Sequence, residues 1–337
     1  MATLSRKRIL TVTASIAVAA LLLWLCFRDL TWAEVRGYLA DCRWEWVLLS
    51  MGLGAVVFWL RALRWRMMLL PVDPATSRTT CFNAINIGYF ASNALSRIGE
   101  FVRCGYVVRH SSRNEDGSRR ASFDKVLGSV VADRVWDALS LALLLGLMLA
   151  LTWTRYGAAI GAVLFGEAGS ALLTWGLLSG ALVLLIFGGW LIYRLRERSR
   201  LFGRLWGFVA GMIDGVKACF RMKGAWKFFL LTAAIWGLYW AMISCIVAAL
   251  SLSGIGPLDT LLMMLVGSIV AIIPVPGAFG TYHAALTFTL SSLFGLPTGL
   301  AAVFATLSHE SQLLTQVLFG TGSLIHESFR STDTETN

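Results

Sequence analysis

The sequence is poor in charge. Only 14% of its 337 residues are Asp, Glu, Lys or Arg, whereas 57% are hydrophobic. A soluble protein of this length needs more polar surface than this to cover its core. Apolar runs of 18 or more residues recur along the chain, and each is long enough to cross a hydrocarbon layer of roughly 30 Å. The scarcity of charge therefore excludes a soluble fold and indicates an integral membrane protein.

Sequence motifs of known enzyme classes are also missing. The patterns HExxH, GxSxG and the P-loop do not occur. The six cysteines contain no CxxC pair, which argues against a disulfide framework and against a cysteine zinc site. Metal-ligand spacing is likewise absent among the four histidines, His110, His283, His309 and His326. We therefore expect no enzyme, no cofactor and no metal.

The net charge of +10 does not indicate a nucleic-acid partner, because no soluble basic domain is available to carry one. The Lys and Arg residues lie in short loops between apolar runs. This is the positive-inside pattern, and it adds an attraction to anionic headgroups. The expected partners are membrane lipids, anionic ones in particular.

Hydropathy predicts an all-α polytopic membrane protein with about six full transmembrane helices. Two further apolar segments, 79–108 and 260–295, are interrupted by polar residues, glycine or proline. Unpaired backbone is tolerated at membrane depth only where it is buried in protein or hydrated, so we expect two re-entrant helical hairpins there. The full spans are expected at 9–27, 45–63, 126–152, 170–193, 228–250 and 298–325.

The loop charges favour re-entrance. If both hairpins return to the side they came from, the basic loops face the cytoplasm and both termini are cytoplasmic. A full crossing by either hairpin would turn the later basic loops outward. The two hairpins then enter from opposite faces, which is how many transporters build a site near the bilayer midplane.

The chain is expected to form a single transmembrane domain over residues 1–330. Within it, segment 201–227 is too charged to span, and its apolar residues recur at helical spacing, which predicts an interfacial amphipathic helix. The polar tail 331–337 is expected to be disordered. The sequence is compatible with a homodimer but does not specify an interface, so the oligomeric state is left undecided at this point.

The first polar constellation spans 93–103 and begins with Asn93. Arg97, Glu100 and Arg103 are spaced by three, so one network can join them. Charges at membrane depth must be paired or hydrated. The arginines either hold a lipid phosphate, for which a guanidinium fork is suited, or only pin the hairpin to its neighbours. Both roles remain open.

The second constellation is Asp133, Arg134 and Asp137, inside the expected span 126–152. Asp133 and Asp137 share one helical face, where they can pair with Arg97 or Arg103. A structural ion pair is the favoured interpretation.

The third constellation is the turn that holds Pro276, Gly277 and Gly280, followed by His283. Proline and glycine stop a helix, expose carbonyl groups and permit a tight reversal. His283 can titrate near neutral pH, although a lone histidine is more often only hydrogen-bonded. A fourth constellation places His309 beside Glu310 in the last span, on or near a face that should point inward, and a polar helix–helix contact is its plainest explanation.

These constellations, in this order, resemble the flippase-like transmembrane domain of the lysyl-phosphatidylglycerol synthase/flippase family. The resemblance covers about residues 10–325 and implies a multi-pass protein of the bacterial cytoplasmic (inner) membrane that moves lipids or lipid-linked groups between leaflets. The synthase domain of bifunctional members has no counterpart here, so we expect this chain not to make lysyl-phosphatidylglycerol. The matching stretches are 61–66, 93–103, 133–137 and 274–280.

The sequence departs from the family at two positions. The family often has proline where Ser96 stands, so the break in the first hairpin would depend on Gly99. It often has glutamate where His283 stands, which makes a different substrate or coupling ion plausible. The aminoacyl-lipid substrate is therefore not carried over.

The favoured hypothesis is a flippase-like transporter of a lipid with an anionic headgroup. In it, Arg97 and Arg103 bind phosphate, Glu100 and Asp133 hold those arginines, and the 277–280 turn supplies backbone contacts. One alternative is an intramembrane transferase that acts on a polyprenyl lipid or glycolipid. Another is a membrane scaffold for a separate lipid-modifying enzyme.

Overall fold

The computed structural model describes residues 6–28, 30–95, 98–165, 171–273 and 275–335. In these ranges the secondary structure is helical, apart from loops and an isolated bridge between Arg113 and Arg119. The prediction of an all-α fold is confirmed. Arg97 and Pro274 lie outside the described residues.

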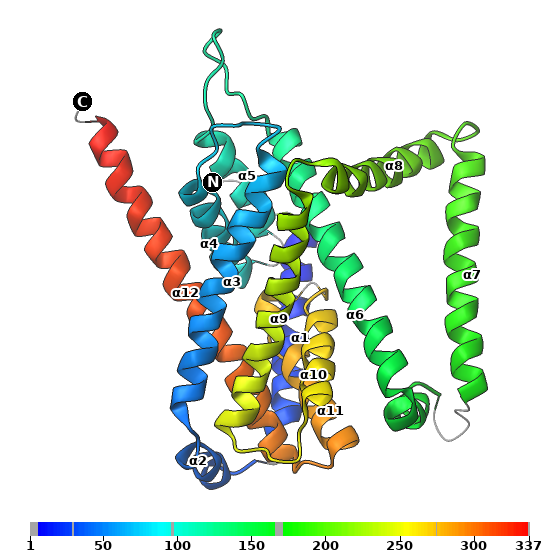
Figure 1. The fold of residues 1–337 in the computed structure, drawn as a ribbon. Helices are drawn as coiled ribbons and strands as arrows, with labels where there is room; N and C mark the ends of the chain where they lie inside the picture. The colour runs from blue at the N-terminus through cyan, green and yellow to red at the C-terminus, as the bar shows by residue number, and fades with distance from the viewer. Residues whose placement is uncertain (1–5, 29, 96–97, 166–170, 274, 336–337) are drawn as a thin grey trace. The chain divides into compact units, whose positions relative to one another are not determined.

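The helices of the described chain are labelled in Figure 1. They are α1 (Arg6–Phe27), α2 (Trp32–Ala40), α3 (Trp44–Leu69), α4 (Arg78–Ala94), α5 (Ile98–Arg109), α6 (Phe123–Phe165), α7 (Ala171–Leu195), α8 (Arg200–Arg221), α9 (Ala225–Ala249), α10 (Pro257–Val270), the 3-10 helix η2 (Pro276–Ala278), α11 (Thr281–Phe294) and α12 (Thr298–Glu335).

Helix α2 was not predicted from the sequence. It begins with a capping box, in which the Thr31 hydroxyl accepts from the Glu34 backbone N–H and the Glu34 carboxylate accepts from Thr31. The sequence TWAE at residues 31–34 fits the capping-box pattern of a helix N-terminus. Their position between two apolar runs made the segment look like a loop.

Three helical stretches are long and apolar enough to cross a membrane, when the described residues are considered: α3, Phe123–Gly157 of α6, and α9. Two shorter apolar stretches, Ala17–Phe27 and Pro257–Val270, accompany them. Large leucine side chains on these helices are exposed, as at Leu48, Leu143 and Leu230. Exposed apolar surface of this extent needs hydrocarbon around it, so the chain is a multi-pass membrane protein.

The chain forms two compact units, Met1–Val130 with Trp226–Asn337, and Val131–Ala225. The second unit contains most of α6 with α7 and α8. Inside it, Trp136 of α6 contacts Phe220 of α8 edge to face at 5.5 Å between ring centroids. Arg196 lies 4.0 Å from the ring centroid of Tyr193. The interfacial position of the α8 segment stays a prediction.

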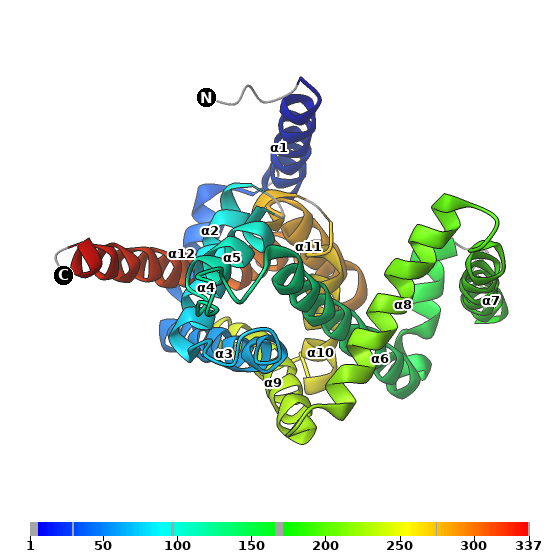
Figure 2. The same cartoon turned by 90° about the horizontal axis from the view of Figure 1, so that it is seen from above.

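The first unit holds both interrupted segments. Segment 79–108 becomes α4 and α5, and segment 260–295 becomes α10, η2 and α11. In Figure 1, α4 and α5 lie in the upper half of this unit, and α10 and α11 lie in its lower half. Figure 2 shows α4 and α5 side by side.

Gly99 lies inside α5 and does not form the break in the first segment. Helix α4 ends at Ala94, and Leu95 is extended, with φ −136° and ψ 114°. A Cβ atom on Gly99 would overlap the carbonyl oxygen of Gly88 in α4. The expectation that Gly99 makes the break was therefore wrong, because this glycine instead permits the close approach of the two helix backbones.

The buried core of the first unit surrounds Trp65 of α3, whose indole N–H donates to the Ser129 hydroxyl at 3.1 Å. Arg61 and Arg64 lie at the end of the expected span 45–63, within the stretch 61–66 that matches the family. Both lie within α3 and are buried. The longer α3 carries them past α9, where Arg61 donates to the Tyr239 hydroxyl at 3.2 Å.

Candidate functional site

The second interrupted segment changes direction at residues with left-handed backbone. Gly277 has φ +57°, Ala278 has φ +55° and Gly280 has φ +74°. A Cβ atom on Gly280 would also overlap the carbonyl oxygen of Ala19 in α1. Glycine adopts such backbone without strain because it lacks Cβ, and the overlap with Ala19 makes it necessary at Gly280. The predicted interruption near Pro276 is present.

The two interrupted segments meet at this turn. The 3-10 helix η2 packs against α4. A Cβ atom built on Gly277 would lie 3.9 Å from the carbonyl oxygen of Asn93, in the last turn of α4. Two chain breaks that are far apart in sequence are thus neighbours in space.

Helix α12 holds the turn through His309. The Nε2 atom of His309 lies 2.7 Å from the carbonyl oxygen of Gly277. A carbonyl only accepts, so this nitrogen carries the hydrogen. The imidazole is surrounded by rings of the second segment, with centroid distances of 5.2 Å to Phe279, 5.2 Å to Tyr282 and 4.9 Å to His283.

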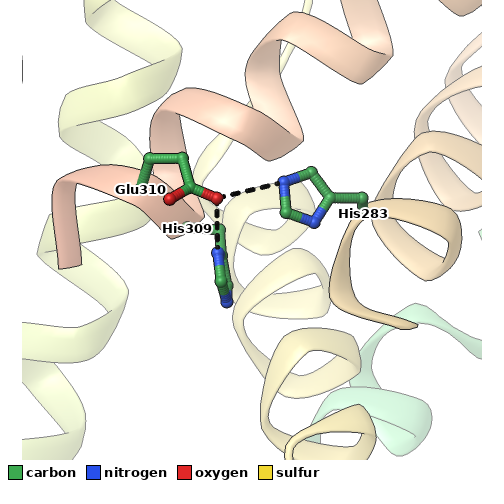
Figure 3. Close-up of side chains that lie close together, drawn as sticks. All are labelled: His283, His309 and Glu310. Carbon is green, nitrogen blue, oxygen red and sulfur yellow. Dashed lines mark hydrogen bonds and ion pairs between the residues drawn. The ribbon is translucent and has the colours of Figure 1, made fainter. Parts of the chain in front are cut away.

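Glu310 lies between two imidazoles. Its Oε1 atom is 3.0 Å from Nδ1 of His309 and 3.5 Å from Nε2 of His283. Figure 3 shows both rings turned towards this carboxylate. The side chain of His283 is 2% exposed, that of His309 10% and that of Glu310 40%. The cluster is therefore open on the side of Glu310 and closed on the side of His283.

The ligand atoms of His283, His309 and Glu310 lie within 4.8 Å of one another. Spacing along the chain did not predict this cluster, because His283 comes from α11 and the other two residues come from α12. Motif spacing detects ligands on one element or in one loop. Contact between α11 and α12 creates the set.

Buried amides line the neighbouring part of α4. The side-chain nitrogens of Asn86 and Asn93 are buried and have no hydrogen-bond partner within the described ranges, and the same holds for Nδ1 of His283. Asn86 and Asn93 are seven residues apart on one helix, so they share a face. Buried polar groups without protein partners commonly mark places where water or a ligand binds.

Of the remaining predicted site residues, those on α5 and α6 that the structure describes do not belong to the cluster of His283, His309 and Glu310. Arg103 of α5 is buried, and its guanidinium carbon lies 4.8 Å from the ring centroid of Trp65. Glu100 is half-buried on the same helix. On α6, in the second unit, Asp133 is buried, Asp137 is half-buried and Arg134 is exposed. The roles predicted for these residues stay predictions.

Sequence reasoning missed a second polar cluster in the first unit. The Tyr106 hydroxyl donates to Glu327 at 2.8 Å, and Nε2 of His110 lies 2.9 Å from the other oxygen of that carboxylate. Nδ1 of His110 donates to the Tyr106 carbonyl at 2.8 Å. His110 directly follows α5, four residues after Tyr106, but no local signal indicates Glu327, which is 217 residues further on.

Interrupted helices that meet beside a buried polar cluster, within a multi-pass apolar chain, place the protein in the class of polytopic helical membrane proteins. Comparison with protein families matches residues 12–320 to the family described as the lysylphosphatidylglycerol synthase TM region. The match covers nearly the whole chain, so the protein belongs to this family. Comparisons with curated proteins and with solved structures each gave no match.

Proposed function

We propose that this protein moves a lipid, or a lipid-linked group, with an anionic headgroup between the leaflets of a bacterial cytoplasmic membrane, without chemical change to the lipid. The observation that carries the proposal is the contact between the two chain breaks, where Gly277 lies beside the carbonyl of Asn93. The family match supports a role in lipid handling.

Helix lengths support re-entrance. Helix α4 has 17 residues, α5 has 12, and α10 and α11 have 14 each. At 1.5 Å per residue none exceeds about 26 Å, and three are shorter than about 22 Å, against roughly 30 Å of hydrocarbon. We infer that each pair enters and leaves on one side, with the pairs on opposite faces as their placement in Figure 1 suggests.

The two breaks offer groups suited to a lipid headgroup. Each break joins the C-terminus of one helix to the N-terminus of the next, so exposed carbonyls and N–H groups occur together. The N-termini of α5 and α11 carry partial positive charge that favours an anion. The amides of Asn86 and Asn93 supply donors on the same side of α4. In this proposal, Arg97 and Arg103 add the positive charge.

A reconstituted transport assay tests the proposal. Purified protein would be placed in liposomes that contain fluorescent phosphatidylglycerol, phosphatidylethanolamine or a polyprenyl-phosphate analogue, and the outer-leaflet label would be quenched chemically. We expect protein-dependent movement of an anionic lipid, and its loss in Asn93→Ala and Arg97→Ala. Asn114→Ala, in the loop between α5 and α6, is the matched control and should transport normally.

Two results would redirect the proposal. No movement of any anionic lipid, with and without a pH gradient, would contradict transport. A changed lipid mass after incubation would support an intramembrane transferase instead. Co-purification of one stoichiometric enzyme, together with no transport by the chain alone, would support a scaffold.

A further inference from the structure

We propose that His283, His309 and Glu310 form a binding site for a divalent transition-metal ion of the zinc type. The site adjoins the turn at Gly277 that the proposed function uses, but metal binding needs no lipid and can be tested in detergent. It is built from the last helix and from the helix that follows the η2 turn.

The hydrogen bond from His309 to Gly277 fixes which ring nitrogen is available. Because Nε2 carries the hydrogen that the Gly277 carbonyl accepts, the lone pair of neutral His309 is on Nδ1. That lone pair faces Oε1 of Glu310 at 3.0 Å, and two lone pairs require a positive centre between or beside them. Metal-binding histidines typically donate their second N–H to a backbone carbonyl in this way.

His283 supplies the third ligand atom. Its Nε2 lies 3.5 Å from the same Glu310 oxygen, and its side chain is 2% exposed. No described residue hydrogen-bonds its Nδ1 atom. Zinc–ligand bonds of about 2.0–2.2 Å in a tetrahedron separate ligand atoms by about 3.3 Å. The two distances to Glu310 bracket this value, and all three ligand atoms lie within 4.8 Å of one another, so side-chain adjustment can bring them around one ion.

The donor set selects the metal. Two imidazole nitrogens and one carboxylate oxygen suit zinc and its neighbours, whereas magnesium and calcium require mainly oxygen ligands. Three protein ligands leave one position open, as in catalytic zinc sites. It lies on the side where Glu310 is 40% exposed, so a water molecule or a headgroup oxygen can complete the coordination.

Metal content is the direct test. The purified full-length chain would be equilibrated with zinc, manganese, magnesium and calcium, desalted, and measured by plasma mass spectrometry. We expect about one zinc per chain in the wild type, and at least a fivefold loss in His283→Ala, His309→Ala and Glu310→Gln. Glu310→Gln keeps the side-chain shape and so guards against loss through misfolding.

His110→Ala is the matched control, because His110 also bridges a backbone carbonyl and a glutamate but has no third ligand. It should retain zinc. Cobalt(II) provides a second readout, since the wild type should give the strong visible absorption of a four- or five-coordinate ion and the three site variants should not.

The proposal would be overturned if the wild type kept no stoichiometric zinc and the spectrum of added cobalt(II) stayed that of the aqueous ion. The contact between His309 and Glu310 would then be a hydrogen bond through a proton. Zinc retained in all three site variants would overturn it as well. Lipid transport that proceeds without bound metal would leave the proposed function standing, so failures of the two proposals are distinguishable.

Discussion

His309 of α12 donates a hydrogen bond of 2.7 Å to the carbonyl oxygen of Gly277, and thereby joins the last helix of the protein to a turn 32 residues earlier. Gly277 in turn lies beside the end of α4. Both chain breaks and α12 are therefore parts of one connected structure. A change at His309 should therefore affect the turn at Gly277 and, through it, the end of α4.

His309→Ala should reduce transport at least tenfold, because it removes the donor to Gly277 and the partner of Glu310. A buried hydrogen bond that involves a charged group contributes about 1.5–3 kcal/mol, so the unfolding free energy should fall by a similar amount. Transport in proteoliposomes and unfolding in detergent would be measured together. His110→Ala, the control with an equivalent pair of contacts, should lose stability but keep transport; equal transport loss in both variants would contradict a specific role for His309.

Gly277→Ala should destabilise the turn, because Gly277 has φ +57° and a Cβ would lie 2.9 Å from the ring of Phe279. The left-handed backbone alone costs a non-glycine residue about 1–2 kcal/mol. The matched control is Gly237→Ala in α9, where nothing lies within 4 Å. It should be neutral or stabilising by up to about 1 kcal/mol. Thermal unfolding in detergent measures both, and equal behaviour of the two variants would refute the assigned role of the turn.

Gly99→Ala should separate α4 from α5, because its new Cβ would overlap the carbonyl of Gly88. Overpacking of this kind costs about 1–3 kcal/mol. Gly105→Ala changes the same residue type in the same helix at an open position, and it should leave stability unchanged. Limited proteolysis at 95–98 and thermal unfolding would report the difference; resistance to proteolysis in Gly99→Ala would show that the close contact is not needed.

Acid sensitivity should depend on Asp73, in the loop between α3 and α4. Burial alone would raise the pKa of this carboxyl, but hydrogen bonds from the side chain and backbone of Ser112 and from the backbone of Ala75, with the charge of Arg120, lower the pKa overall. Because the folded pKa lies below the unfolded value of about 3.9, the stabilisation is complete above that value. It is lost as the pH falls through the folded pKa.

Asp73→Asn should therefore lower the unfolding free energy by about 1–3 kcal/mol at neutral pH and flatten its fall below about pH 4. Unfolding would be followed between neutral and acidic pH. Asp116→Asn is the control, since Asp116 makes similar hydrogen bonds to Ser118 at an exposed loop, and it should change little. An unaltered acid profile in Asp73→Asn would contradict the assignment.

The sequence predicted the helices well because each depends on local composition. The six segments expected to span are helical and fall in α1, α3, α6, α7, α9 and α12, while the count of six crossings stays a prediction. The break in 260–295 was also predicted from its own residues, since proline and glycine act on their own backbone. The break in 79–108 was predicted from its polar residues, although its glycines lie inside helices. The predictions failed where contacts between helices determine a residue's role. Gly99 permits the close approach of α5 to α4, and Arg64 is buried inside the protein. Neither fact follows from the local sequence.

By itself, the sequence determined that this is a helical membrane protein of the lysylphosphatidylglycerol synthase TM family and where its helices are interrupted. The tertiary structure alone decided that Gly277 lies beside Asn93 and that His283 joins His309 and Glu310. The reason is physical. Helix formation and membrane partition depend on residues within one or two turns, whereas a site assembled from α4, α11 and α12 depends on contacts between segments that no local pattern encodes.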